Sequence, residues 1–456
     1  MTTVSAQDWQ DRLSTTRYSV INGEIRPKTT GGMDSIRSSF HVDYDRVVFS
    51  RAFRRLGRKT QVHPFAISDH THNRLTHSVE VASVGRSIGN MVGAALQSAN
   101  LLPHGYSPSN IGTVVQVACL AHDLGNPPFG HTGEAVLREW FNDPKHRIYL
   151  DALDDDKQRC DICTYEGNAH SLRTVLRLEM YQNQGGMRLT AASVGALLKY
   201  PWESSNPSSD GGKFNFYQSE MPLVRQIATQ LGLPKLGEDH WARHPLSYLM
   251  EAADDICYAL LDLEDAVEMG LIDIEDFYKT VQNIDGIDKL KNIPNPEQRC
   301  GAMRGVTIGK AIESVSHTFM QHHDALMMGK FTDKDLLAVS DDAIKKTLQD
   351  AKQLATNKIF RHDSKIATEI AAFGCLSSIL DLLIPAVYAH HQNQKTQTKY
   401  ALALSLIGFD TQNKRSLYED YMMVLDFICG LTDNTAARLA KDISGVSMGH
   451  DHGLNF

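Results

Sequence analysis

The sequence predicts an all-α protein, and three observations support that expectation. Apolar residues recur along most of the chain at the three-to-four-residue spacing of amphipathic helices. Alternating, Val-rich runs bounded by turn residues are scarce, so at most a short hairpin near 214–217 is expected. The 456 residues, 42% apolar and 22% charged, can bury a large core and have the composition of a globular protein.

The first helices are expected near 44–56 and 75–96. Around the end of the first, a run of basic residues in 51–59 lies opposite apolar ones. The apolar residues are Phe49, Phe53 and Leu56, and the basic ones are Arg51, Arg54, Arg55, Arg58 and Lys59. A solvated or interface-facing surface is the plain interpretation of most of these basic side chains. The segment 75–96 has its apolar face at Val81, Val84, Ile88 and Val92.

The next predicted helix, near 111–124, ends at Gly125, and two prolines at 127–128 prevent its continuation. Further helices are expected near 131–141, 168–181 and 190–199. The strongest helical pattern covers 249–267, where apolar residues follow one another at alternating intervals of four and three: Leu249, Ala253, Ile256, Leu260, Leu263 and Val267. Helices near 365–386 and 417–430 complete the prediction.

Three stretches interrupt the helical pattern. Residues 142–165 contain an acidic cluster, 201–213 are rich in Pro, Ser and Gly, and 272–310 form a weakly patterned connection with two prolines. None of them has the composition of a linker that isolates a domain. We therefore expect one helical body over residues 1–270 and a helical C-terminal region, 271–456, packed on it.

Charge and cysteine content restrict the functional classes. The 54 acidic and 46 basic side chains give a formal charge of −8, which argues against a protein that coats nucleic acid but permits a local basic pocket for a phosphorylated small molecule. The seven cysteines are odd in number and scattered. No signal sequence and no apolar run of about 18 residues is evident. A reduced, cytoplasmic protein without a membrane segment is expected.

The segment 119–134 contains the most informative motif. His122 and Asp123 stand at the end of the predicted helix, where both side chains can lean into one cleft. Taken alone, such a pair would be a helix cap and a solvated acid. Two other helices change that interpretation, because one begins near His77 and another contains Asp254 and Asp255. Two imidazoles and two carboxylates from three helices would bind manganese, magnesium, iron or cobalt and leave positions for water and phosphate oxygens.

The chain resembles the HD-domain metal-dependent phosphohydrolases and, more narrowly, the bacterial dGTPase-like deoxynucleoside triphosphate triphosphohydrolases. The matching blocks occur in family order between about residues 40 and 270: 53–56 (FRRL), 59–62 (KTQV), 73–77 (NRLTH), 121–134 (AHDLGNPPFGHTGE), 166–168 (EGN), 199–202 (KYPW), 218–220 (QSE), 251–256 (EAADDI) and 263–266 (LEDA). The C-terminal third matches only loosely. The resemblance implies an HD-domain helical core with a helical C-terminal extension that completes a nucleotide pocket.

The resemblance also implies roles for individual residues. The metal ligands would be His77, His122, Asp123 and Asp254. His131 and Glu134 would act in acid–base catalysis near the scissile P–O bond, although Glu134 could instead serve the N-terminus of its helix. The residues expected to contact phosphate are Arg74, Asn168, Lys199, Tyr200 and Lys213.

The sugar and base would be bound by residues from several segments. Tyr258 and Asp262 follow Asp254 by four and eight residues, along a helical stripe of about 12 Å at 1.5 Å per residue, and the resemblance places them against the sugar. An exposed helix charge is the alternative for Asp262. Gln61 and Val62 would form a wall of the pocket, and Phe360 and Glu369 would complete the base site.

The reaction implied is hydrolysis of a dNTP to the deoxynucleoside and inorganic triphosphate. One alternative is an HD phosphohydrolase with another nucleotide or phosphoester substrate, and another is a nucleotide- or single-stranded-DNA-responsive binding protein whose HD site is structural. The resemblance further implies a homo-oligomer, with a hexamer as one form, and regulation by a nucleotide or by single-stranded DNA.

Overall fold

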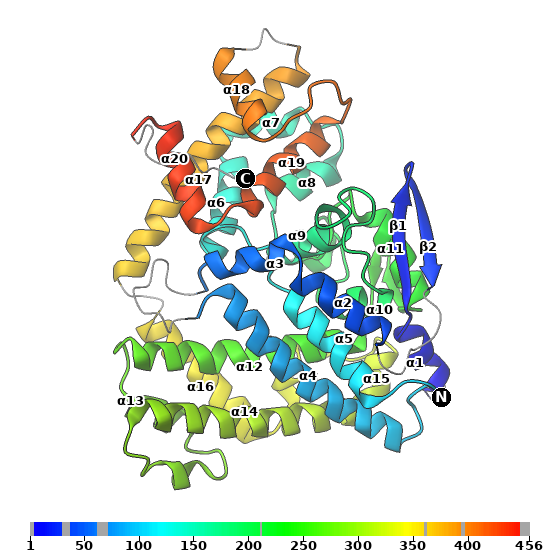
Figure 1. Ribbon diagram of the computed structural model, residues 1–456, viewed down its shortest axis with the longest axis vertical. Coiled ribbons are helices and arrows are strands. Elements are labelled where there is room, and N and C mark those ends of the chain that lie inside the picture. Colours follow the sequence, from blue (N-terminus) through cyan, green and yellow to red (C-terminus); the bar gives the residue numbers. More distant parts are fainter. Residues whose placement is uncertain are drawn as a thin grey trace.

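Helices form nearly all of the regular structure (Figure 1), which confirms the all-α prediction. The computed structural model describes residues 4–29, 37–61, 72–209, 212–359, 363–393 and 397–446. Two of the predicted pocket residues, Val62 and Phe360, lie outside these ranges. The described residues form two hydrophobic clusters, which we call the lower core and the upper core after their places in Figure 1.

Three helices form the centre of the lower core: α4 (Arg74–Ser98), α5 (Pro108–Ala121) and α12 (Pro245–Glu268). Helix α12 contains the predicted segment 249–267 and buries its apolar side chains, as its spacing requires. Around these helices pack α1 (Ala6–Arg12), α2 (Ser39–Val48), α3 (Arg51–Arg55), α10 (Ala191–Leu197), α11 (Met221–Gln230), α13 (Ile274–Val281), α14 (Pro296–Gln321), α15 (His323–Met327) and α16 (Asp342–Lys358).

The upper core is built from an early and a late part of the chain. The early helices are α6 (Gly130–Asn142), α7 (Arg147–Asp151) and α8 (Asp156–Cys163). The late helices are α17 (Asp363–His391), α18 (Thr398–Leu406), α19 (Leu417–Gly430) and α20 (Asp433–Ile443). Helix α9 (Gly167–Arg173) contributes to both cores, with Ala169 in the upper and Leu172 in the lower. Because both cores draw on residues from either side of position 270, the division into 1–270 and 271–456 stays a prediction.

The strands lie elsewhere than expected. Residues 214–217 form no strand, and Phe216 makes only an isolated bridge with Glu203, so the prediction of a hairpin there is wrong. The hairpin lies instead at the N-terminus, where β1 (Thr16–Ile21) pairs antiparallel with β2 (Glu24–Thr29). Its turn residues Asn22 and Gly23 have φ of 52° and 79°, the positive values that a tight two-residue hairpin turn requires. A second, very short pair joins β3 (Lys235–Gly237) and β4 (His240–Trp241).

Two helix predictions also need correction. The single helix expected near 44–56 is two helices, because the first ends at Val48 and Ser50 caps α3 by accepting the N–H of Phe53. The connection expected at 272–310 contains α13 and the first half of α14. Its two prolines precede or begin α14 rather than break it, since Pro296 occupies the first helical position, where a missing N–H does no harm.

Within the described residues, one helix is long and apolar enough to meet the length and composition of a membrane span, at Lys365–His391 of α17. Half of its most apolar window is buried inside the protein. Its Asp381 accepts a hydrogen bond from the indole N–H of Trp140 on α6, at 2.8 Å. This contact is part of the packing of α17 against α6.

Candidate metal centre

Helices α4, α5 and α12 bring three of the four predicted metal ligands together. His77 lies in the first turn of α4, His122 caps the C-terminus of α5, and Asp254 lies in α12. One potential ligand atom from each lies within 4.8 Å of the others. The Nε2 atoms of His77 and His122 are 3.1 and 3.4 Å from Oδ1 of Asp254. The three donors could therefore hold a divalent ion.

The backbone around His122 determines which imidazole nitrogen faces this cluster. The His122 Nδ1 lies 2.6 Å from the carbonyl oxygen of Cys119. A carbonyl oxygen can only accept, so Nδ1 carries the proton and Nε2 is left as the available metal ligand. Burial alone would lower the pKa of His122, but the carboxylates of Asp123 and Asp254 outweigh it and raise this pKa to about 9. A bound cation would replace the second proton, the one that the charged imidazole carries on Nε2.

The two carboxylates of the cluster have different partners. Burial would raise the pKa of Asp254, but the two imidazoles hold it well below its usual value. Asp123 lies beside the cluster, with Oδ1 at 3.6 Å from the His122 Nε2. Its Oδ2 accepts from the Arg74 guanidinium at 2.8 Å, and its Oδ1 accepts from the Asn126 amide. Asp123 is thus within reach of an ion at this site and stays a predicted ligand.

His131 and Glu134 stand next to the cluster at the start of α6. The chain enters α6 through two left-handed residues, Phe129 and Gly130, with φ of 64° and 57°. The imidazole of His131 is 80% exposed, whereas the carboxylate of Glu134 is buried, and 3.6 Å separates the His131 Nδ1 from Glu134 Oε2. The exposed ring is therefore free to meet a ligand while its Nδ1 faces a carboxylate.

The network around Glu134 shows what this carboxylate binds. Its Oε1 accepts the N–H of Gly167 at 3.1 Å, and its Oε2 accepts from Arg138 at 3.2 Å. Burial would raise the pKa of Glu134, but His131, Lys213 and Arg138 together lower it. The carboxylate thus binds α9 and neighbouring cations. The alternative, that Glu134 serves the dipole at the N-terminus of its own helix, is not favoured, because Glu134 lies beyond the first turn of α6, where that effect fades.

Sixteen residues line one cavity of about 290 Å³ around this cluster. Of the residues predicted for phosphate, all five line it: Arg74, Asn168, Lys199, Tyr200 and Lys213. All three cations already have carboxylate partners: Arg74 lies 2.8 Å from Asp123, Lys199 lies 3.2 Å from Glu251, and Lys213 lies 3.0 Å from Glu166. These pairs keep cationic groups at the cavity wall although the whole chain is acidic.

Only some of the residues predicted for the sugar and base line this cavity or the pocket beside it. Tyr258 and Gln61 line the cavity, and Glu369 lines a smaller adjoining pocket of about 70 Å³. Asp262 is 4% exposed, so the alternative of an exposed helix charge is wrong for it. Within the described residues, Oδ2 of Asp262 and Oε1 of Gln61 are buried without a hydrogen-bond partner. Gln61 lines the cavity, where a ligand's hydroxyl or amino group could satisfy its oxygen, whereas Asp262 lines neither the cavity nor the adjoining pocket.

Sequence reasoning missed some residues of the cavity. Lys365 on α17 lines both this cavity and the adjoining pocket. It stands four residues before Glu369, a helical spacing that could have drawn attention to it, although it lies in the divergent C-terminal third. Asp255 also lines the cavity and pairs with Lys352 of α16 at 2.9 Å. Both contacts bring the C-terminal part of the chain to the site.

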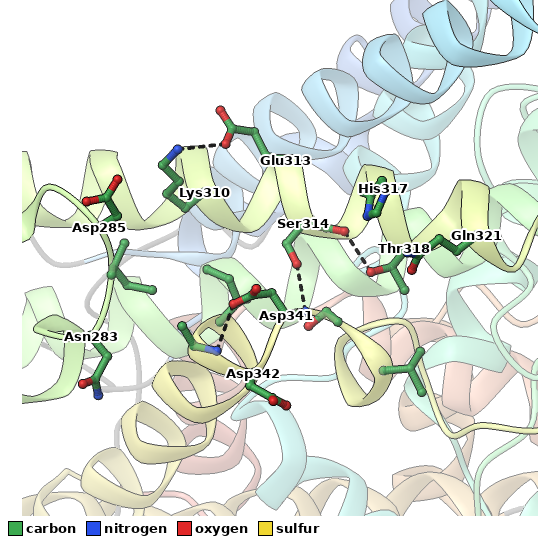
Figure 2. Close-up of a pocket in the computed structure, with 15 residues that line it drawn as sticks. Asn283, Asp285, Lys310, Glu313, Ser314, His317, Thr318, Gln321, Asp341 and Asp342 are labelled. Carbon is green, nitrogen blue, oxygen red and sulfur yellow. Dashed lines mark hydrogen bonds and ion pairs between the residues drawn. The ribbon is translucent and has the colours of Figure 1, made fainter.

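A larger cavity, of about 730 Å³, lies elsewhere, between α14 and the start of α16 (Figure 2). Its polar side chains include Lys310, Glu313 and His317, and Lys310 pairs with Glu313 at 3.0 Å. None of the predicted site residues lines it. Size alone therefore does not identify the functional site, which is marked by the convergence of metal-binding and cationic groups.

The chain is similar to known proteins over nearly its whole length. The HD domain family matches residues 74–158. The chain is 41% identical over 451 residues to a "Deoxyguanosinetriphosphate triphosphohydrolase-like protein" of Pseudomonas aeruginosa (strain LESB58), with 96% of this chain and 99% of that protein covered. A protein of the same description from a Synechocystis species is 34% identical, covering 90% and 95%. A "Deoxyguanosinetriphosphate triphosphohydrolase" of Yersinia pestis (strain Pestoides F) is 28% identical, covering 90% and 94%.

Proposed function

The chain belongs to the HD-domain family of deoxyguanosinetriphosphate triphosphohydrolase-like proteins, and on that premise we propose that it hydrolyses a dNTP to the deoxynucleoside and inorganic triphosphate. One observation carries the proposal: a single cavity is lined by His77, His122 and Asp254, by the cations of Arg74, Lys199 and Lys213, and by His131 with Glu134. A polyanionic substrate, a divalent ion and a proton donor could meet there.

The metal would be held by His77, His122 and Asp254, with Asp123 as the fourth ligand. The donor set fits a divalent ion, because two imidazole nitrogens and a carboxylate oxygen converge and the His122 Nδ1 is already occupied. Mixed nitrogen and oxygen ligation suits manganese, magnesium, iron or cobalt. When bound, such an ion supplies Lewis acidity at the phosphate and makes nearby water a better nucleophile.

The proton for the leaving 5′ oxygen would come from His131. Its Nδ1 faces the Glu134 carboxylate, so Nε2 is the atom available to a substrate in the cavity. Glu134 orients the imidazole through its Nδ1 and is itself fixed by Arg138 and the Gly167 N–H. A positioned imidazole of this kind can act as a general acid at neutral pH.

The remaining wall would bind the triphosphate and the deoxyribose. Arg74, Lys199 and Lys213 supply positive charge, and Asn168 and Tyr200 supply hydrogen-bonding groups at the same wall. Tyr258 would close against C2′ of the sugar, and Asp262 would bind the 3′-hydroxyl. Gln61 and Glu369, with Val62 and Phe360, would contact the base.

The C-terminal region would complete this pocket, as Lys365, Glu369 and Lys352 suggest by their positions. We further propose that residues 1–270 form the catalytic core and 271–456 the region that completes it. A cytoplasmic homo-oligomer, a hexamer among its forms, and control by a nucleotide or single-stranded DNA belong to the same proposal. Sedimentation with and without these ligands tests the assembly.

The reaction is tested by incubating Mn²⁺-loaded protein with each dNTP and separating the products by chromatography. Equimolar deoxynucleoside and triphosphate are expected. Release of pyrophosphate or phosphate would instead indicate an HD phosphohydrolase of other specificity. Tight nucleotide binding without turnover would indicate a binding protein with a structural HD site. Asp254→Asn is the matched control, because it keeps the shape of the side chain but weakens the ligand.

A further inference from the structure

The buried carboxylate of Asp433 joins the C-terminal helix α20 to two loops of the candidate site. Asp433 is the first residue of α20 and is 3% exposed. Its Oδ1 accepts the N–H of Phe129 at 3.0 Å, and its Oδ2 accepts both the N–H of Thr60, at 2.8 Å, and the Thr60 hydroxyl. One side chain thus satisfies two backbone donors that are far apart in sequence.

The first of these loops determines where His131 stands. Phe129 adopts the left-handed conformation, with φ of 64° and ψ of 16°, which is unfavourable for a residue that carries a side chain. Gly130 continues the turn with φ of 57°, and His131 follows at once. A conformation of this kind persists only where its surroundings hold it, and the bond from Phe129 N–H to Asp433 does so directly.

The second loop leads to the wall of the pocket and to the metal helix. Thr60 precedes Gln61 and forms a bridge with Asn73, the residue that caps α4. The N–H of Arg74 donates to the carbonyl oxygen of Lys59 at 3.2 Å. The start of α4, which carries the first predicted metal ligand, is therefore also held by Lys59, through a bond that Asp433 does not make.

A neighbouring lysine makes a second link between the C-terminal helices and the two loops of the candidate site. Lys59 is 3% exposed, and its ammonium donates to the carbonyl oxygens of Asn126 and Cys429, each at 2.6 Å. Asn126 lies in the loop that leads to Phe129, and Cys429 lies in α19, next to α20. The contact between the α19–α20 corner and these two loops of the candidate site is thus buried and polar. A contact of this type favours one arrangement over others.

We propose that Asp433 is a positioning residue for His131, an inference that rests on the function proposed above. Asp433 lines neither the cavity nor the adjoining pocket, so it acts through the backbone it binds. By fixing the turn at Phe129 it aims the His131 imidazole at the leaving oxygen. The C-terminal helices therefore contribute to proton transfer without touching the substrate.

The test combines Asp433→Ala and Asp433→Asn with His131→Ala. Asparagine keeps one acceptor and should have the smaller effect. For Asp433→Ala, we expect kcat to fall about 10–100-fold, a part of the roughly 10²–10⁴-fold that a general acid contributes, while KM and the affinity for Mn²⁺ alone change less than about threefold. Hydrogen exchange of the peptide covering 126–133 should accelerate in both variants.

The double variant Asp433→Ala/His131→Ala separates positioning from general damage. If Asp433 acts through His131, the double variant should have the kcat of His131→Ala alone. Additive losses in kcat, or unchanged hydrogen exchange at 126–133, would overturn the inference.

Asp420→Asn is the control, because Asp420 is buried in α19 and binds Arg415 and His391 away from the site. This variant should lower Tm and leave kcat unchanged. Absence of triphosphate release by the wild-type protein would instead overturn the proposed function, and the catalytic part of this inference with it.

Discussion

At the residue scale, the metal centre is prepared by a single backbone contact, the bond from His122 Nδ1 to the Cys119 carbonyl. Nε2 is then the nitrogen that can bind an ion, and the Asp254 carboxylate lies beside it as a second ligand. Removal of this carboxylate should therefore release the ion. We expect chelation to abolish activity, Mn²⁺ to restore it, and Asp254→Ala to lose bound metal and turnover together. Metal analysis and activity on the same sample provide the measurement. Full activity in protein shown to be free of metal would refute the assignment.

Asp123 allows a sharper comparison, because it has a second role. Its Oδ2 accepts from Arg74, so Asp123→Ala removes a predicted ligand and releases a cation into the cavity. We expect this variant to lose metal as Asp254→Ala does but to retain nucleotide affinity better. Calorimetric titration with a dNTP in the presence of EDTA would measure it. Equal nucleotide affinity in both variants would show that Arg74 is not released toward the phosphates.

His131 should contribute to turnover rather than to binding. His131→Ala should keep its metal and bind nucleotide, yet lose about 10²–10⁴-fold in kcat, the usual range for a general acid–base group. Steady-state kinetics with saturating Mn²⁺ would measure this loss. A variant whose KM rises while kcat holds would make His131 a binding residue.

Tyr258 and Asp262 should select deoxyribose, and Asp262 adds a dependence on pH. Burial and the nearby Asp265 raise the pKa of Asp262 to about 8, so at pH 7 the side chain is mainly neutral. Asp262→Asn, which resembles the neutral acid, should therefore behave like wild type at pH 7. Between pH 7 and 9 the wild-type carboxyl ionises, and its KM for dNTP should change, whereas KM of Asp262→Asn should not.

Tyr258→Ala tests the shape of the sugar site. Rejection of an added hydroxyl by shape alone gives about 10²-fold discrimination, so this variant should narrow the dNTP-to-NTP ratio by up to that factor. Matched kinetics with dGTP and GTP would measure the ratio. An unchanged ratio in Tyr258→Ala would mean that the 2′ position is recognised elsewhere.

At the element scale, the turn that follows α5 lies very close to the backbone of α9. A Cβ added to Gly125 would lie 2.0 Å from the Ser171 nitrogen of α9. Gly125→Ala should therefore force the two segments apart and destabilise the protein by about 1–3 kcal/mol, as overpacking does. Gly309→Ala is the matched control, since Gly309 is exposed within α14 and a Cβ there meets nothing within 4 Å. That change should stabilise by about 0.5–1 kcal/mol; urea titrations would compare the two.

Local periodicity accounts for which elements could be predicted. The spacing of apolar residues located α4, α12 and α19, because long amphipathic helices repeat the same signal many times. The spacing of apolar residues did not reveal features that depend on one or two residues. The Asn22–Gly23 turn produces the N-terminal hairpin, and Ser50 divides one expected helix into two. In both cases a single residue pair or cap outweighs the surrounding periodicity.

At the scale of the whole molecule, the candidate site lies where the two cores meet, and this explains which of its residues the sequence could identify. His77, His122 and Asp254 lie within continuous motifs of the matching region, and the structure brings these three together. Lys365 and Asp433 reach the site from α17 and α20, elements that pack there only through contacts of long sequence separation. No local pattern encodes such contacts, so these two residues required the fold.

Asp161 connects the upper core to the loop after α10, and its burial should make the stability of the whole protein depend on pH. Its carboxylate is fully buried and accepts from Ser204, the Gln218 N–H and the Tyr418 hydroxyl, the last two at 2.7 and 2.6 Å. Burial outweighs these bonds and raises the pKa of Asp161 from 3.8 to about 8. Between these values the unfolded chain releases a proton that the folded protein retains, so this group's contribution to stability falls as pH rises through that window and levels off above it.

Asp161→Asn should remove this slope, because the amide does not titrate. Any stability lost because the new amide N–H₂ lacks a suitable partner is the same at every pH. It therefore changes the free energy of unfolding but not its dependence on pH. We therefore expect the stability of Asp161→Asn relative to wild type to improve steadily from pH 5 to pH 8, by at most about 1.4 kcal/mol for each unit of pKa shift. Urea titrations at pH 5, 6, 7 and 8 would measure the difference. A difference that stays constant with pH would show that Asp161 is ionised in the folded protein, with its three donors overcoming burial.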